Sequence, residues 1–274
     1  MVGFTGLTFV ALLTVLPILF IVIYIFYKGI PAISLEFLIK FPTEGMRSGG
    51  IFPAILGTIY LTFLTTLFVV PLGIAAAVYL SEYAQDNRWT RTIRLAIINL
   101  AGIPSIVYGL FGLGIFVLFF KMGTSILAAS LTLAIMTLPV VISTSEEALS
   151  SVPQSFRVVS VSLGATKWQT IQRIVLPNSI SGILTGVILG LERAAGETAP
   201  ILFTGAAFYL PTLPTSPLDP TMALPYHLYV ISTQVPGMPS EIQFGTALVL
   251  LVLVLGMNLI ATIIRARARA RRQW

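Results

Sequence analysis

Long apolar runs dominate the chain, and short clusters of charged residues separate them. A helix needs roughly 20 apolar residues to cross the hydrocarbon core of a bilayer. By that measure the sequence predicts six membrane-spanning helices, at about residues 4–27, 51–80, 95–120, 124–143, 180–207 and 242–264. No Lys or Arg precedes the first run, so it lacks the basic region of a signal peptide and is expected to be retained. The predicted fold is an all-α polytopic membrane protein whose single transmembrane domain occupies residues 1–274.

The composition supports this class and narrows the chemistry. Charged residues make up 9% of the chain, whereas soluble domains carry about 25%, so lipid must cover much of the surface. The chain contains no cysteine, which excludes thiolate sites. It contains one histidine, which nearly excludes a metal site built from histidine ligands. The sequence contains neither a Gly-x-x-x-x-Gly-Lys-Ser/Thr loop nor a credible nucleophile–base set. We therefore expect no ATP binding, no enzymatic activity and no cofactor in this chain.

Lysine and arginine are unevenly shared between the two sets of connecting segments. One set holds eleven: Arg88, Arg91, Arg94, Arg157, Lys167, Arg173, Arg265, Arg267, Arg269, Arg271 and Arg272. The other set holds four: Lys28, Lys40, Arg47 and Lys121. The positive-inside rule places the first set in the cytoplasm, and six spans then leave both termini there. Because the arginine-rich C-terminal tail abuts a span, we interpret it as a topology anchor on anionic lipid rather than a nucleic-acid site.

Two extracytoplasmic segments are long, at residues 28–50 and 208–240, and the second is rich in proline. Pro-rich loops can present a semi-rigid surface to a partner, although a plain connection that caps the bundle is an equal alternative. His227 lies in the second segment without a nearby carboxylate or second histidine. We therefore expect a solvated or interface histidine rather than a metal ligand.

The predicted cytoplasmic segment 144–179 is patterned rather than a bare connector. Pro153 suits the first turn of a short helix over 154–163, which would place Phe156, Val159 and Leu163 on one side. Gly164 then provides a corner, and a second short helix over 167–175 would end at Pro177. The sequence predicts a compact knob at the membrane surface, with an ordinary pair of interfacial helices as the alternative.

The predicted fifth span carries a stripe of unusual residues. On a continuous helix one face would hold Gly182, Gly186, Gly190, Arg193 and Glu197. Glycines four residues apart let a neighbouring helix approach closely. A charge in mid-membrane is costly, and the planar fork of an arginine matches two oxygens of an oxyanion. The presence of Arg193 therefore indicates a path for an anion through the membrane. The alternative is that Arg193 belongs to a buried ion pair that fixes how the helices pack.

Glu197 bears on which anion is bound. A carboxylate accepts a hydrogen bond from a protonated phosphate, whereas it repels a fully ionised sulfate. As a hypothesis, Arg193 attracts the anion, and Glu197 either holds Arg193 or reads the phosphate proton. Glu192 lies about 100° away on the wheel and is expected to face another helix or subunit.

The knob segment resembles the EAA loop of binding-protein-dependent ABC importer permeases. The resemblance rests on Gly164, on Ile174 and Leu176-Pro177 after it, and on Leu163-Gly164-Ala165-Thr166-Lys167-Trp168. It implies the type I importer permease fold with a coupling loop that docks on a cytosolic ATPase. The residues implied in docking are Arg157, Leu163, Gly164, Ala165, Thr166, Lys167 and Pro177. The Glu-Ala-Ala of that family is Val158-Val159-Ser160 here, so Arg157 is expected to replace part of the missing polar contact.

A second resemblance narrows the family. The stretch Arg193-Ala194-Ala195-Gly196-Glu197-Thr198-Ala199-Pro200 is similar to the fifth-span signature of PstA-type phosphate permeases, as are residues 49–58 and 102–110. It implies a bacterial inner-membrane subunit with Arg193, Glu197 and Thr198 on the substrate path. The implied partners are a PstC-type sister permease, two copies of a PstB-type ATPase that carry ATP and Mg, and a PstS-type extracytoplasmic phosphate-binding protein.

Three alternatives to a phosphate importer remain open at this point. The nearest is a permease of the same architecture for molybdate or sulfate, against which Glu197 argues. A stand-alone secondary transporter would often show inverted repeats or interrupted spans, and no strong repeat is visible in the sequence. A membrane sensor or assembly factor would not depend on an ATPase for uptake.

Overall fold

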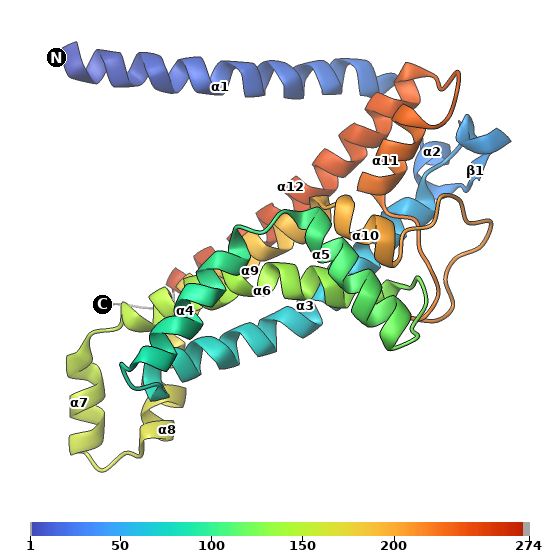
Figure 1. The fold of residues 1–274 in the computed structure, drawn as a ribbon. Helices are drawn as coiled ribbons and strands as arrows, with labels where there is room; N and C mark the ends of the chain where they lie inside the picture. The colour runs from blue at the N-terminus through green and yellow to red at the C-terminus, as the bar shows by residue number, and fades with distance from the viewer. Residues whose placement is uncertain (1, 271–274) are drawn as a thin grey trace.

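The computed structural model describes residues 2–270 and is almost entirely helical (Figure 1). Five long elements form its frame: α1 (Val2–Gly29), α3 (Phe52–Val78), α6 (Ile126–Ser150), α9 (Leu176–Gly196) and α12 (Ser240–Ala270). Residues Arg271 and Arg272 of the predicted anchor lie outside the described residues. Within 2–270, five helices are long and apolar enough to cross a membrane, or six when one bent pair counts as a span.

Helices α3, α6 and α9 form the centre of the bundle, because α6 packs against both of the others. A buried apolar cluster at one end of the bundle includes Leu61, Leu133 and Met136. A second cluster at the other end includes Ala77, Leu149 and Val175. Helix α1 lies apart from this bundle and packs against α12, where the centres of the Tyr24 and Phe244 rings are 5.4 Å apart (Figure 1).

The predicted third span is not one straight helix. Helix α4 (Arg88–Ala101) and helix α5 (Ser105–Gly112), which continues as a π-helical segment over Leu113–Phe119, meet at an angle of 103°. Pro104 explains the break, because it lacks an N–H and disfavours helical geometry at the residue before it. The Tyr108 hydroxyl donates to the Leu100 carbonyl across the bend, at 2.8 Å.

The predicted fifth span over 180–207 is also interrupted. Helix α9 ends at Gly196, Glu197 is extended with φ −75° and ψ 136°, and a short helix α10 follows (Ala199–Thr204). Pro200 accounts for this end, since its ring would clash with the Gly196 carbonyl in a continuous helix. In the first turn of α10 the missing N–H of Pro200 is harmless.

The knob projects from one end of the bundle and comprises residues 154–170 (Figure 1). Helix α7 (Gln154–Ser162) is followed by Gly164 at φ +84° and by α8 (Lys167–Thr170). The expected end of the second knob helix at Pro177 is wrong, because Lys167–Gly196 is one continuous span. A π-helical turn over Ile171–Val175 widens the helix where the proline ring would meet the Arg173 carbonyl.

The segments at the opposite end carry secondary structure that the sequence pattern did not predict. The first contains a 3₁₀ turn (Ile30–Ala32), helix α2 (Leu35–Ile39), a 3₁₀ turn (Glu44–Met46), and an antiparallel hairpin of β1 (Pro42–Thr43) and β2 (Ser48–Gly49). The second contains helix α11 (Leu224–Thr233), in which His227 is 2% exposed. His227 is therefore neither solvated nor at a surface of this chain. Arg47 joins the two segments by donating to the Pro236 carbonyl at 2.6 Å.

Candidate functional site

The two interrupted spans meet inside the bundle. Helices α5 and α10, which follow the two breaks, pack against each other and against α6 (Figure 1). A Cβ atom on Gly109 of α5 would lie 3.0 Å from the Ala199 carbonyl oxygen and from the Pro200 Cα. A side chain at this position would crowd the start of α10, so glycine suits the close approach of α10 to α5.

Arg193 and Glu197 flank the break in the fifth span. Arg193 occupies the last turn of α9, and its Nε lies 3.6 Å from Oε1 of Glu197. The two side chains are 32% and 19% exposed. Within residues 2–270, the Arg193 guanidinium donates no hydrogen bond. The pair forms as the sequence spacing predicts, but Glu197 lies just beyond the end of α9 in an extended conformation rather than on the same helical face. The guanidinium therefore keeps its donors available beside a loosely paired carboxylate.

Glu197 also faces α3 and α11. It borders a small cavity together with Thr58, Thr62 and Pro225. Thr58 donates to the Ala54 carbonyl and accepts from the Leu224 N–H, both at 2.8 Å, and Thr62 donates to the Thr58 carbonyl. These hydroxyls are occupied by backbone groups, as is common for threonine in spans.

Thr198 and Glu192 take different positions around the same helix end. Thr198 is half-buried at the residue before α10 and makes no side-chain capping bond. Glu192 faces away from Arg193 and lines a small cavity with Met257 and Asn258 of α12. The neighbour of Glu192 is thus another helix of the same chain.

The glycine stripe of α9 faces α6. A Cβ atom on Gly182 would lie 2.5 Å from the Ala148 Cβ, and one on Gly186 would overlap the Thr144 side chain. A Cβ on Gly190 would lie 3.1 Å from Val141. The stripe lets α9 and α6 approach closely and leaves Arg193 at its far end.

The knob turns apolar side chains outward. Exposed apolar residues cover its surface: Val158, Val159, Val161, Leu163 and Trp168. In contrast to these apolar residues, the polar Ser160 is buried, and its hydroxyl shares a 2.8 Å hydrogen bond with the Thr170 hydroxyl. Of the three residues expected on one side of this helix, Phe156 packs inward, whereas Val159 and Leu163 are exposed. The knob therefore presents an exposed face that is largely apolar.

The corner of the knob is held by local bonds. Thr166 and Gln169 form a reciprocal capping box at the start of α8. The Lys167 Nζ lies 4.8 Å from the centre of the Tyr83 ring. Gly164 and Leu163 are exposed at the tip and Ala165 is half-exposed, whereas Pro177 lies inside the span that follows.

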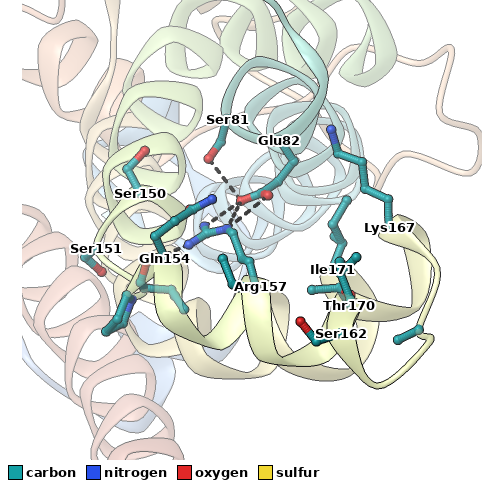
Figure 2. Close-up of a pocket in the computed structure, with 15 residues that line it drawn as sticks. Ser81, Glu82, Ser150, Ser151, Gln154, Arg157, Ser162, Lys167, Thr170 and Ile171 are labelled. Atoms are coloured by element: carbon teal, nitrogen blue, oxygen red, sulfur yellow. Dashed lines mark hydrogen bonds and ion pairs between the residues drawn. The ribbon is translucent and has the colours of Figure 1, made fainter.

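Arg157 does not belong to the outer surface of the knob. Figure 2 shows its side chain pointing inward to Glu82, with an Nη2–Oε1 distance of 2.6 Å. Its Nη1 donates to the Val152 carbonyl at 2.6 Å, and its Nη2 also donates to the Leu149 carbonyl at 2.9 Å. The two side chains of the pair are 14% and 7% exposed. Sequence spacing could not reveal this partner, which is 75 residues away.

Comparisons with known proteins agree with this architecture. The family described as "Binding-protein-dependent transport system inner membrane component" matches residues 69–271. The chain is 39% identical over 248 residues to a protein of Methanocaldococcus jannaschii called "Probable phosphate transport system permease protein PstA", covering 90% of this chain and 86% of the relative. It is 36% identical over 237 residues to the "Phosphate transport system permease protein PstA" of Pasteurella multocida, covering 86% and 83%.

A solved structure supports the fold. A chain of a bacterial alginate ABC transporter, in complex with a periplasmic protein that holds an alginate pentasaccharide, superposes with a TM-score of 0.69 at 17% identity. The superposition covers 96% of this chain and 94% of that chain.

Proposed function

The chain belongs to the family of inner-membrane components of binding-protein-dependent transport systems, and from this membership we propose that it is the PstA-type permease of a phosphate importer. It is a multi-pass, non-catalytic membrane subunit with the fold of type I ABC importer permeases. ATP is hydrolysed on a separate ATPase, and an extracytoplasmic binding protein delivers the substrate.

One observation carries the choice of substrate. Arg193 offers a guanidinium whose donors are free within the described residues, and the Glu197 carboxylate stands 3.6 Å away. An oxyanion that kept a proton could accept from Arg193 and donate to Glu197 at the same time. Phosphate near neutral pH meets that requirement, and sulfate does not. The similarity to two phosphate permeases over most of their length supports the same choice.

The proposed assembly follows from the family. A PstC-type sister permease would supply the other half of the path, two copies of a PstB-type ATPase would bind below, and a PstS-type protein would bind the opposite face. The knob end carries the larger share of Lys and Arg, which supports a cytoplasmic position for it and for both termini. ATPase closure would move the knob, open the bundle outward, and release phosphate inward after hydrolysis.

The test is ATP-dependent uptake of labelled phosphate by the reconstituted complex. Arg193→Gln should lower uptake by roughly tenfold or more, because a hydrogen bond to a charged group contributes about 1.5–3 kcal/mol. Glu197→Gln should lower uptake and weaken the discrimination against sulfate in competition. Glu192→Gln is the matched control, since Glu192 lies on the same helix but faces α12.

The outcomes distinguish a substrate-binding role from a packing role for Arg193 and Glu197. Loss of uptake with assembly and ATPase activity retained supports Arg193 on the phosphate path. Unchanged uptake in Arg193→Gln reduces the pair to helix packing. Uptake of molybdate or sulfate in place of phosphate by the unaltered complex overturns the proposed substrate.

A further inference from the structure

Cationic side chains from three other elements contact the end of α3 that lies beside the knob. A π-helical turn over Tyr79–Tyr83 ends this helix. Arg94 of α4 donates to the Leu80 carbonyl at 2.9 Å, Arg157 of α7 pairs with Glu82, and Lys167 of α8 lies over the Tyr83 ring. Two of these three contacts come from the knob, although the knob is not adjacent to α3 along the chain.

The Glu82–Arg157 pair bridges a groove rather than a packed interface. In the described residues α7 packs against α8 and the turn after it, and has no comparably extensive contact with α3. An open groove separates them, lined by Ser81, Gln154, Val158 and Ala165 as well as by the pair (Figure 2). A rigid displacement of α7 therefore reaches α3 through this pair and the Lys167 contact. It also reaches α3 through Phe156, which packs against the apolar cluster that contains Ala77 and Val78.

The geometry of Arg157 suits the transmission of force. Its Nε and Nη2 both reach the Glu82 carboxylate, at 3.2 Å and 2.6 Å, while Nη1 and Nη2 also bind carbonyls at the end of α6. A guanidinium fixed by this many directed bonds keeps one orientation. Within the part of the chain that the structure describes, Arg193 makes no such bonds, so the two arginines are suited to different tasks.

Helix α3 connects this pair to the proposed substrate path. The same helix that ends beside Glu82 carries Thr58 and Thr62, which border the cavity at Glu197. We propose that Glu82 and Arg157 are positioning residues that make α3 follow the knob, so that closure of the ATPase moves the α3 wall of the Glu197 cavity. This role rests on the proposed function, because it assumes that the knob receives the ATPase.

The experiment follows α3 directly in the complete importer. Because the chain contains no cysteine, Thr62→Cys gives this subunit a single thiol at the cavity. Its rate of modification by a small thiol reagent is compared without nucleotide and with ATP and vanadate, in a complex whose partner chains have been cleared of reactive cysteines. The nucleotide-dependent change in rate should fall by roughly tenfold when Glu82→Ala is added, within the 5- to 150-fold range of ordinary coupling.

Glu146→Gln is the matched control, because Glu146 pairs with Arg94 at 2.8 Å at the same end of the bundle without involving the knob. It should leave the nucleotide-dependent change intact. A second readout is the phosphate imported per ATP hydrolysed, which Glu82→Ala should lower while ATPase activity stays within about twofold of the unaltered importer.

A cross-linking experiment distinguishes a loss of coupling from misfolding of the Glu82→Ala variant. Glu82→Cys with Arg157→Cys, joined by a short bifunctional thiol reagent, should restore the imported phosphate per ATP that the uncross-linked double variant has lost. An unchanged thiol response in Glu82→Ala, or a loss of coupling that the cross-link does not restore, overturns the proposal. If the unaltered importer moves no phosphate, the proposed substrate fails, while the thiol response still decides the role of this pair.

Discussion

Acid should weaken the packing of α11, because His227 is held neutral inside the protein. His227 is 2% exposed, and its Nδ1 is buried without a hydrogen-bond partner in the part of the chain that the structure describes. Burial lowers the pKa of His227 from 6.5 to about 4. In the unfolded chain the imidazole takes up its proton near pH 6.5, so between pH 6.5 and 4 the unfolded state binds more protons than the folded one.

The magnitude follows from that difference. The stability that the neutral imidazole preserves is fully present above pH 6.5 and is lost as the pH falls toward 4. Linkage gives a loss of about 2 kcal/mol between about pH 7.5 and pH 5, approaching roughly 3 kcal/mol below pH 4. For a chain of this size, 2 kcal/mol corresponds to about 4–8 °C in the midpoint of thermal unfolding.

Thermal unfolding in detergent across this pH range would measure the effect, with His227→Leu as the comparison. The variant keeps an apolar side chain of similar size and cannot titrate, and all other titrating groups contribute equally to both proteins. The stability of the wild type should therefore fall relative to the variant as the pH drops, and hydrogen exchange should rise first in residues 224–233. A constant difference between the two proteins from pH 7.5 to 5 would refute the reasoning.

Three further substitutions and one control test packing and backbone geometry. Gly186→Ala should destabilise the α6–α9 contact by about 1–3 kcal/mol, because the added Cβ overlaps a neighbouring side chain. Gly256→Ala is the control, and it should be neutral or slightly stabilising because the space around Gly256 is open. The midpoints of thermal unfolding of the two variants give the comparison. Thr58→Val removes the acceptor of the buried Leu224 N–H and should cost about 1–3 kcal/mol, seen as faster amide exchange at the start of α11. Gly164→Ala places a side chain at φ +84° and should cost about 1–2 kcal/mol, with weaker binding of the ATPase in a pull-down as the readout; unaltered binding would show that the corner tolerates the change.

The uninterrupted spans were predictable because their signal is local. Runs of apolar residues located α1, α3 and α12 with only end errors, and glycines four residues apart on α9 do face another helix. Helix α6 was also found, although it continues to Ser150 because apolar and small residues keep its last turns packed against neighbours.

The two breaks were not predictable from proline alone. Pro71 and Pro139 lie within α3 and α6 without ending them, whereas Pro104 and Pro200 mark breaks. A proline inside a span is tolerated when neighbouring groups satisfy the freed carbonyl, and that depends on the packed structure rather than on the local sequence. The position of Glu197 outside the helix follows from the same long-range dependence.

The inward turn of Arg157 was unpredictable for a related reason. An arginine among exposed valines on a short helix favours a polar surface contact when the sequence is considered alone. Its partner Glu82 comes from another span, and the carbonyls it binds become available only where α6 ends. The apolar side chains of α7 are therefore exposed while its arginine turns inward, an arrangement that fits the proposed docking of the ATPase on this face.

The exposed valines and leucine of the knob have a consequence for how the subunit is made. Val158, Val161 and Leu163 are each more than half exposed, and in the proposed orientation an isolated copy would present them to the cytosol. Apolar surface of this kind favours aggregation and recognition by proteases when it stays uncovered. We expect the lifetime of newly inserted chains to depend on how soon an ATPase covers the knob, so that the cell would maintain the ratio of the two subunits by degrading the unpaired permease.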